Sequence, residues 1–175
     1  TQNPIEQEGT YPLPEAQLDR FLMLVKIDYP AVEAERDILK LVRNEAAYVE
    51  GQEPGQLAQA NLFSARQEVL AMHMAPEVEE YIIQLVMATR KPELYGDDLN
   101  AWLEYGTSPR GTISLDRCAR AHSWIQGRDF VSPDDVQEIL FDVLRHRILL
   151  SFEAEASGIT PDHVLETIRE RVPSA

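Results

Sequence analysis

Three times along the chain, a serine or threonine directly precedes a proline that opens a stretch with apolar residues at helical spacing. The three dipeptides are Ser108-Pro109, Ser132-Pro133 and Thr160-Pro161. A hydroxyl in this place can accept a hydrogen bond from a free N–H group of the first helical turn, and proline is favoured at the first helical position. These dipeptides therefore predict three helix starts, which makes the C-terminal part of the chain helical.

Apolar residues three and four positions apart, the spacing of one helix face, extend the helical prediction to most of the chain. Such stretches occupy 38–46, 78–86, 115–125, 136–144 and 164–172. Before them, residues 22–28 (LMLVKID) are apolar enough for a buried strand that ends at Tyr29-Pro30. We expect a mainly α chain: one strand and a short helix within 1–29, then an all-helical bundle over 30–175. Loop-like connectors are expected at 50–56 and 91–106.

Composition limits the partners that the surface can bind. The 175 residues include 30 acidic and 16 basic side chains, for a net charge of −14 at pH 7. Binding along a nucleic-acid backbone or an anionic membrane needs a clustered positive surface, so both are disfavoured. With 44% hydrophobic residues the chain can bury a core. No apolar run approaches the roughly 18 residues of a membrane span.

Cysteine and histidine content gives no support to a metal site. Cys118 is the single cysteine, which excludes an internal disulfide and cysteine-based zinc sites and fits a reducing, cytoplasmic setting. His73 and His163 have no partner at ligand spacing, and His122 lies on an apolar stripe where it should pack in the core. His146 should sit near the end of a helix over 133–148, where basic side chains complement the helix dipole. No metal is expected.

Arg110 is unusual for a residue in the first turn of a helix. The other two Ser/Thr-Pro starts are followed by acids, at 134–135 and 162, which complement the positive end of the helix dipole. A cation in this place costs roughly 0.3–1 kcal/mol, whereas helix N-termini attract anions. Arg110 therefore either points to solvent or a surface acid, or reaches a phosphate near the helix end.

Two polar residues near the start of the chain have ordinary interpretations as well. Asn3 precedes Pro4 and fits a turn after a strand. Arg20 follows Asp19 and fits a surface Asp–Arg pair beside a buried Phe21. Taken singly, neither residue predicts a function.

Several short sequence words in a fixed order resemble the MoxR family of AAA+ ATPases. They are Asn-Pro (3–4), LPEAQLDRF (13–21), YP (29–30), ATR (88–90), GTSPR (106–110), GRDFVSPDDV (127–136) and VLRHRI (143–148). The resemblance runs over the whole chain. It implies the C-terminal part of such an ATPase: the end of the α/β nucleotide-binding core over 1–29, and the helical lid domain over 30–175.

The resemblance also implies roles for three residues. Asn3 matches sensor 1, which helps to position the attacking water. Arg20 matches the arginine finger that one subunit offers to the γ-phosphate bound by its neighbour, and Arg110 matches sensor 2, which contacts the nucleotide from the lid. Arginines placed in this way can contribute about 10³–10⁵ in rate. Whether Arg110 acts within its own subunit or on the neighbour's nucleotide is left open.

The motifs that bind ATP and Mg²⁺ in such proteins are missing from this sequence. There is no Gly-x-x-x-x-Gly-Lys-Ser/Thr and no apolar strand that ends in paired acids. We therefore expect these ligands upstream of residue 1, in a longer protein of which this chain begins at sensor 1. On this expectation the chain alone does not hydrolyse ATP and holds no tightly bound cofactor.

The resemblance further implies a homo-oligomeric ring, with a hexamer expected, that couples ATP hydrolysis to chaperone-like remodelling or maturation of a client protein. Proteins with von Willebrand factor A domains are expected partners. A magnesium-chelatase-like subunit would use the same three residues in the same roles. A non-enzymatic helical interaction module is the alternative from another class, and a Walker A motif upstream in the gene would decide between it and an ATPase.

Overall fold

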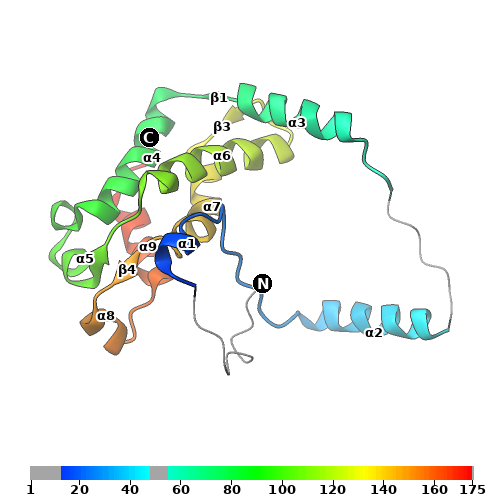
Figure 1. The fold of residues 1–175 in the computed structure, drawn as a ribbon, viewed down its shortest axis with the longest axis horizontal. Helices are drawn as coiled ribbons and strands as arrows, with labels where there is room; N and C mark the ends of the chain where they lie inside the picture. Colours follow the sequence, from blue (N-terminus) through cyan, green and yellow to red (C-terminus); the bar gives the residue numbers. More distant parts are fainter. Residues whose placement is uncertain (1–12, 48–54, 175) are drawn as a thin grey trace. The chain divides into compact units, whose positions relative to one another are not determined.

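The computed structural model describes residues 13–47 and 55–174, and its contacts divide the chain into two units. The first unit combines the segment that ends at Leu24 with the segment from Gln67 onward, and the second is Val25–Arg66. Figure 1 labels the helices and strands of both. As the periodicity predicts, the structure is mainly α, with only short strands among the described residues.

The first unit is a helical bundle with two small strand pairs (Figure 1). Its helices are α1 (Glu15–Leu18), the end of α3 (Gln59–Ala71), α4 (Pro76–Arg90), α5 (Asp97–Trp102), α6 (Pro109–Ile125), α7 (Pro133–Leu144), α8 (Phe152–Ala156) and α9 (Pro161–Arg171), with a 3₁₀ turn η2 (Pro92–Leu94). Strand β1 (His73–Met74) pairs in parallel with β3 (Phe130–Val131). Strand β2 (Leu103–Tyr105) pairs antiparallel with β4 (Leu149–Leu150).

Helices α4, α6, α7 and α9 pack together and supply most of the hydrophobic core. Their largest fully buried side chains are Tyr81, Leu85, Leu115, Leu140, Leu144, Leu165 and Ile168. These residues lie on the apolar stripes of the sequence, because one face of each helix is turned to its neighbours. Cys118 is also buried, and burial raises the pKa of its thiol.

All three expected helix starts are confirmed. The Ser108 hydroxyl accepts a hydrogen bond from Arg110 N, and the Thr160 hydroxyl accepts one from His163 N. At the start of α7, Ser132 N donates to Asp135 Oδ2 at 2.8 Å. The proline after each cap is the first helical residue, where its lack of an N–H group has no cost.

Two local expectations were wrong. Residues 22–28 form no strand ladder within the part of the chain that the structure describes, and Val25 and Ile27 are 62% and 91% exposed. A strand needs a hydrogen-bonding partner along its edge, which a local apolar run cannot supply. The segment 91–106 is not a plain loop, because it contains η2, α5 and β2.

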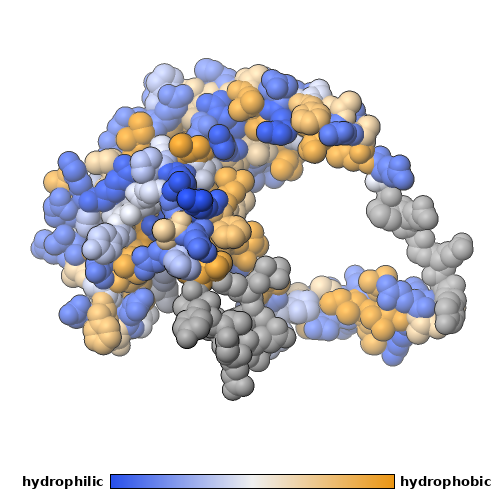
Figure 2. Space-filling model, in the orientation of Figure 1, coloured by the Kyte–Doolittle hydropathy of each residue, from blue (hydrophilic) through white to orange (hydrophobic). Residues whose placement is uncertain are grey.

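The second unit contains α2 (Val32–Ala46) and the first residues of α3. The expected helix around 38–46 is therefore confirmed. Its apolar side chains are exposed, as the orange patches on α2 show in Figure 2; they include Ile38, Leu39, Leu41 and Val42. Among the described residues, no helix combines the length and apolar character that crossing a membrane requires.

Candidate functional site

Arg110 stands in the first turn of α6, and its side chain is tied to the LDRF segment. Its Nη1 donates to Asp19 Oδ2 at 2.9 Å, across 91 residues of sequence. The Arg110 side chain is 55% exposed and that of Asp19 only 15%. Of the two interpretations open to Arg110, the structure shows a pairing with an acid, while leaving more than half of the side chain in solvent.

Asp19 is the hub of this site, because three side chains meet at its carboxylate. Besides Arg110, the Ser108 hydroxyl donates to both carboxylate oxygens, at 3.0 and 2.9 Å. Arg147 Nε lies 3.3 Å from Asp19 Oδ1, as an ion-pair contact rather than an aligned hydrogen bond. Burial alone would raise the pKa of Asp19, but the bonds from Arg110 and Ser108 and the charge of Arg147 outweigh it and lower this pKa. Asp19 is therefore a stable anion at neutral pH.

Arg147 lies beneath Asp19 and is almost completely buried, with 1% of its side chain exposed. Its Nη2 donates to the Asp19 carbonyl at 3.4 Å and to the Phe21 carbonyl at 2.5 Å. Its Nη1 donates to the Leu22 carbonyl at 3.2 Å. Ser114 of α6 accepts a further bond from Nη2 at 3.2 Å. One guanidinium thus joins residues 19–22 to α6 and to the end of α7.

The two residues before Arg147 hold the same segment. Arg145 Nη1 donates to the Leu24 carbonyl at 3.2 Å, and Leu24 N donates to the Asp142 carbonyl at 2.7 Å. His146 Nε2 lies 3.3 Å from the Phe21 carbonyl, which can only accept, so Nε2 carries the proton. Burial, with a contribution from the charge of Arg147, lowers the pKa of His146. Helix α7 ends at Leu144, so this basic run does not lie within a helix over 133–148 as expected.

The ATR word positions the start of α6. Thr89 Oγ1 accepts from Thr107 N at 3.1 Å, and Arg90 Nε donates to the Thr107 carbonyl at 2.8 Å. Gly106 passes so close to α4 that an added Cβ would lie 2.2 Å from the Thr89 carbonyl oxygen. The words ATR and GTSPR therefore act together: the first fixes the backbone from which the second presents Arg110.

Arg20 lies next to this hub and is exposed. Its backbone N donates to the Gln17 carbonyl at 3.1 Å. Within residues 13–47 and 55–174, its side chain makes no hydrogen bond or ion pair, and Phe21 is 56% exposed. The ordinary interpretation of Arg20, a surface pair with Asp19 beside a buried Phe21, is therefore wrong. Asn3 lies outside the described residues.

A second polar cluster stabilises the frame between α6 and α7. Its centre is Asp135, whose side chain is completely buried. His122 Nδ1 lies 2.7 Å from Asp135 Oδ1, Arg128 Nη2 contacts the same oxygen, and Ser132 donates to Oδ2 through its N and its hydroxyl. Burial would raise the pKa of Asp135, but these donors lower it. His122 is thus a satisfied packing histidine, as expected.

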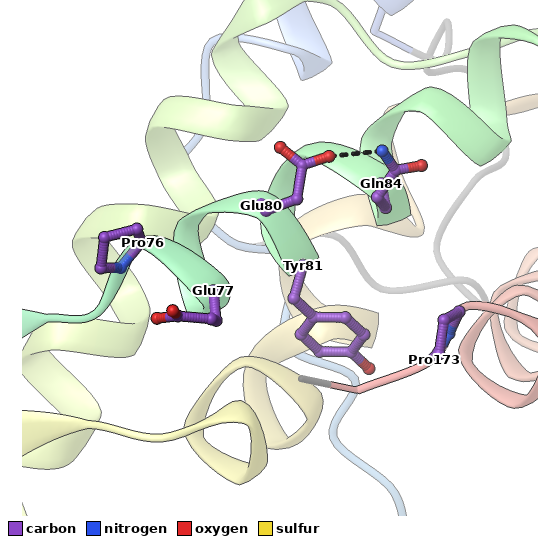
Figure 3. A pocket seen from close by; sticks show the side chains of 6 residues that line it. All are labelled: Pro76, Glu77, Glu80, Tyr81, Gln84 and Pro173. Atoms are coloured by element: carbon purple, nitrogen blue, oxygen red, sulfur yellow. Dashed lines mark hydrogen bonds between the residues drawn. The ribbon is translucent and has the colours of Figure 1, made fainter.

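Among the described residues, the first unit has a hollow beside the hub and another along α4. The one beside the hub has a volume of about 200 Å³ and is lined by Asp19, Ser108, Tyr105, His146 and Arg147 among others. A larger one of about 470 Å³, drawn in Figure 3, lies along α4: Tyr81 points towards Pro173 of the C-terminal segment, whereas Glu80 points away from it and accepts a hydrogen bond from Gln84. The described residues bring together no group of three or more His, Cys, Asp or Glu side chains that could hold a metal ion.

Comparison with known proteins identifies the family. The AAA lid domain family matches residues 100–168, and the ATPase family associated with various cellular activities (AAA) matches residues 1–23. Chaperone MoxR1 of Mycobacterium tuberculosis is 39% identical over 98% of this chain and 45% of its own length. Protein MoxR of Paracoccus denitrificans is 34% identical over 91% of this chain and 50% of its own length.

The chain belongs to the MoxR family of AAA proteins. A crystal structure from Cytophaga hutchinsonii, provisionally described as an ATPase, matches it with a TM-score of 0.93 at 40% identity, over 99% of this chain and 52% of that one. This MoxR-family chain spans about half the length of the curated relatives it matches. Members of the wider AAA family use a nucleotide with Mg²⁺.

Sequence reasoning missed Asp19, Arg147 and Thr89 as parts of the site. All three lie inside words that carried the resemblance, LDRF, VLRHRI and ATR, so their positions were marked without a role. The missing information was spatial, because Asp19 and Arg147 are 128 residues apart. The local signal in the sequence is the basic run Arg145-His146-Arg147, which directly follows the apolar stretch 136–144. A basic residue next to a buried stretch can itself be buried, and a buried charge usually has a partner.

Proposed function

We propose that this chain is the part of a MoxR-type ATPase that presents two arginines, Arg20 and Arg110, to one bound ATP. The observation that supports it is the Asp19 hub. Asp19 binds the Arg110 side chain directly and precedes Arg20 in the chain, so both cations emerge from the same small area. Two exposed arginines held this close can serve the same phosphate group.

The donors present fit a triphosphate. A guanidinium has five N–H donors in a planar fork. Arg110 donates one hydrogen bond to Asp19, and its side chain stays more than half exposed. Arg20 is exposed, and its side chain makes no hydrogen bond or ion pair within the described residues. Bound ATP would bring a γ-phosphate whose negative charge spreads over its oxygens during transfer, and arginines aimed at that charge lower the barrier. Asn3 is proposed as sensor 1, and the ligands of Mg²⁺ are proposed to come from the rest of the protein.

The shared position of the two arginines also bears on which subunit they serve. The family resemblance implies that Arg20, as an arginine finger, acts on the nucleotide of a neighbouring subunit. Because Arg110 is bonded to the residue before Arg20, we propose that it acts on that same neighbouring nucleotide. This places ATP at the interfaces of a homo-oligomeric ring, with a hexamer as the proposed state.

The work done by such a ring is proposed to be chaperone-like remodelling or maturation of a client protein. One relative is named a chaperone, which supports the proposal at the level of the family. Proteins with von Willebrand factor A domains remain the proposed partners. The chain itself, without the upstream half, is proposed to be inactive in hydrolysis.

A subunit-mixing experiment tests the proposal in the full-length protein. Variant one carries Arg20→Ala, and variant two carries a substitution of the P-loop lysine that we place upstream; each alone should have little ATP turnover. In a mixed ring, a wild-type P-loop meets a neighbour's wild-type Arg20, so mixing should restore turnover. The same experiment with Arg110→Ala in place of Arg20→Ala should also restore it.

Each outcome of mixing has a definite meaning. If Arg110→Ala is not complemented while Arg20→Ala is, Arg110 serves its own subunit. A folded Arg20→Ala ring with wild-type turnover would contradict the finger assignment. If the wild-type full-length protein does not hydrolyse ATP at all, the helical interaction module becomes the better interpretation.

A further inference from the structure

We propose that Asp19 is a positioning residue for this site: seated on the buried Arg147, its carboxylate sets where Arg20 and Arg110 stand relative to each other. The inference rests on the proposed function, because positioning matters only if the two arginines meet a phosphate. Asp19 directly precedes Arg20 and is bonded to Arg110, and the family resemblance gives it no role of its own.

The first support is the way in which the backbone of Arg20 is held. Arg147 Nη2 donates to the carbonyls of Asp19 and Phe21, which are the residues immediately before and after Arg20. The peptide units on both sides of Arg20 are therefore tied to a single buried group. Arg20 is itself exposed, so its backbone is held while the residue remains accessible to solvent.

The second support is that Asp19 connects this base to the start of α6. Its carboxylate accepts from Ser108 and Arg110, and its Oδ1 also lies within ion-pair distance of Arg147. Ser108 caps α6 with the same hydroxyl that donates to Asp19, since that oxygen accepts from Arg110 N at 3.1 Å. A shift of Asp19 would therefore move the helix cap and the Arg110 side chain together.

The third support is that the segment directly after Arg20, residues 21–24, depends on this anchoring. Residues 21–24 lie outside any helix or strand, and their backbone groups bond to Arg145, His146 and Arg147 at the end of α7. Without a ladder or helix of its own, the segment is held by these side-chain bonds together with backbone bonds from Phe21 N to the Leu18 carbonyl and from Leu24 N to the Asp142 carbonyl. Arg147 makes two of these four side-chain bonds, and Asp19 neutralises its guanidinium, since burying an unpaired cation is costly.

The test compares Asp19→Asn with Asp98→Asn in the full-length protein. Asp98 is a suitable control because it also pairs with an arginine, Arg171, at 2.6 and 2.5 Å. Like Asp19 it accepts from one further hydrogen-bond donor, here the backbone N–H of Leu99 instead of a serine hydroxyl. No bond links Asp98 to Arg20 or Arg110 in the described residues. Both changes are nearly isosteric and remove one negative charge.

We expect Asp19→Asn to lower the kcat for ATP by about ten- to a hundredfold, because small misplacement of catalytic groups has effects of this size. The KM for ATP should change less than about threefold, since Asp19 does not contact the nucleotide, and Asp98→Asn should leave both constants within about twofold. Arg147→Lys keeps the charge but loses the fork that bridges two carbonyls, and should lower kcat in the same way. If that variant fails to fold, Asp19→Asn alone carries the test.

A second measurement separates this inference from the proposed function. Hydrogen exchange should be faster at the amides of 20–24 and at the start of α6 in Asp19→Asn than in wild type or Asp98→Asn, whether or not the protein hydrolyses ATP. If the wild-type protein hydrolyses ATP and Asp19→Asn has the same kcat, the inference is overturned and the proposed function stands. Unchanged exchange in 20–24 would overturn it as well. An inactive wild-type protein with faster exchange in Asp19→Asn would instead refute the proposed function and retain the anchoring.

Discussion

The buried carboxylate of Asp135 should be worth several kcal/mol to the stability of the bundle. Its side chain is fully buried, and two donors reach each oxygen: His122 and Arg128 at Oδ1, and the two groups of Ser132 at Oδ2. In Asp135→Asn one oxygen becomes an NH₂ group, which can only donate. Two of the four donors then lose their acceptor.

The magnitude follows from these bonds. A hydrogen bond to a charged group contributes about 1.5–3 kcal/mol, and removing one partner of a buried pair costs about 3–5 kcal/mol. His122 and Arg128 are 28% and 33% exposed and can regain some hydration, which points to the lower end. We expect Asp135→Asn to lower the free energy of unfolding by about 3 kcal/mol, a large share of the roughly 5–15 kcal/mol of a typical domain.

Urea unfolding of the chain, followed by the fluorescence of Trp102 and Trp124, measures this difference. Asp134→Asn is the control, because Asp134 lies in the same helical turn but is exposed, and its loss should cost no more than about 1 kcal/mol. The lowered pKa of Asp135 adds a pH test. Its stabilisation is present above the unfolded pKa of about 3.9 and is lost as the pH falls through the lower folded pKa. Equal effects of the two substitutions at pH 7, or a difference that does not shrink in acid, would refute the argument.

Three further changes test the frame of the site. In Gly106→Ala the new methyl group would meet a backbone carbonyl of α4 at 2.2 Å, so unfolding free energy should fall by about 1–3 kcal/mol, whereas Gly55→Ala, with open space around it, should have little effect in the same urea assay. Ser108→Ala removes the cap of α6 and should lower the melting temperature by an amount equivalent to about 1 kcal/mol, with Ser108→Thr restoring most of it; an unchanged melting temperature would mean that the cap is not used. The lowered pKa of His146 means that the unfolded chain binds its proton first, so stability should be full above the ordinary pKa of about 6.5 and fall as the pH drops from there towards the folded pKa. His146→Gln should remove this slope between pH 7 and 5, and a slope that survives would assign it to another group.

Some features of this protein were decided by the sequence alone. The helix starts at Ser108, Ser132 and Thr160 were predictable because a cap is a local arrangement: a hydroxyl, a proline and the free N–H groups of one turn lie within four residues of each other. The apolar stripes were predictive for the same reason, since helix geometry alone brings them onto one face. The family was predictable from words in a fixed order. The roles of Asn3, Arg20 and Arg110 rest on that resemblance and stay predictions.

Other features were decided only by the tertiary structure. The run at 22–28 has strand composition but no ladder partner in the described chain, and its backbone bonds go instead to side chains at the end of α7. The partner of Arg110 is Asp19, 91 residues earlier, and the guanidinium beneath both comes from Arg147. A helix or a cap requires only neighbouring residues, whereas the energy of a buried ion pair depends on which groups the fold removes from water together. Local sequence can therefore mark where a charge lies, and only the packed structure decides which opposite charge it meets.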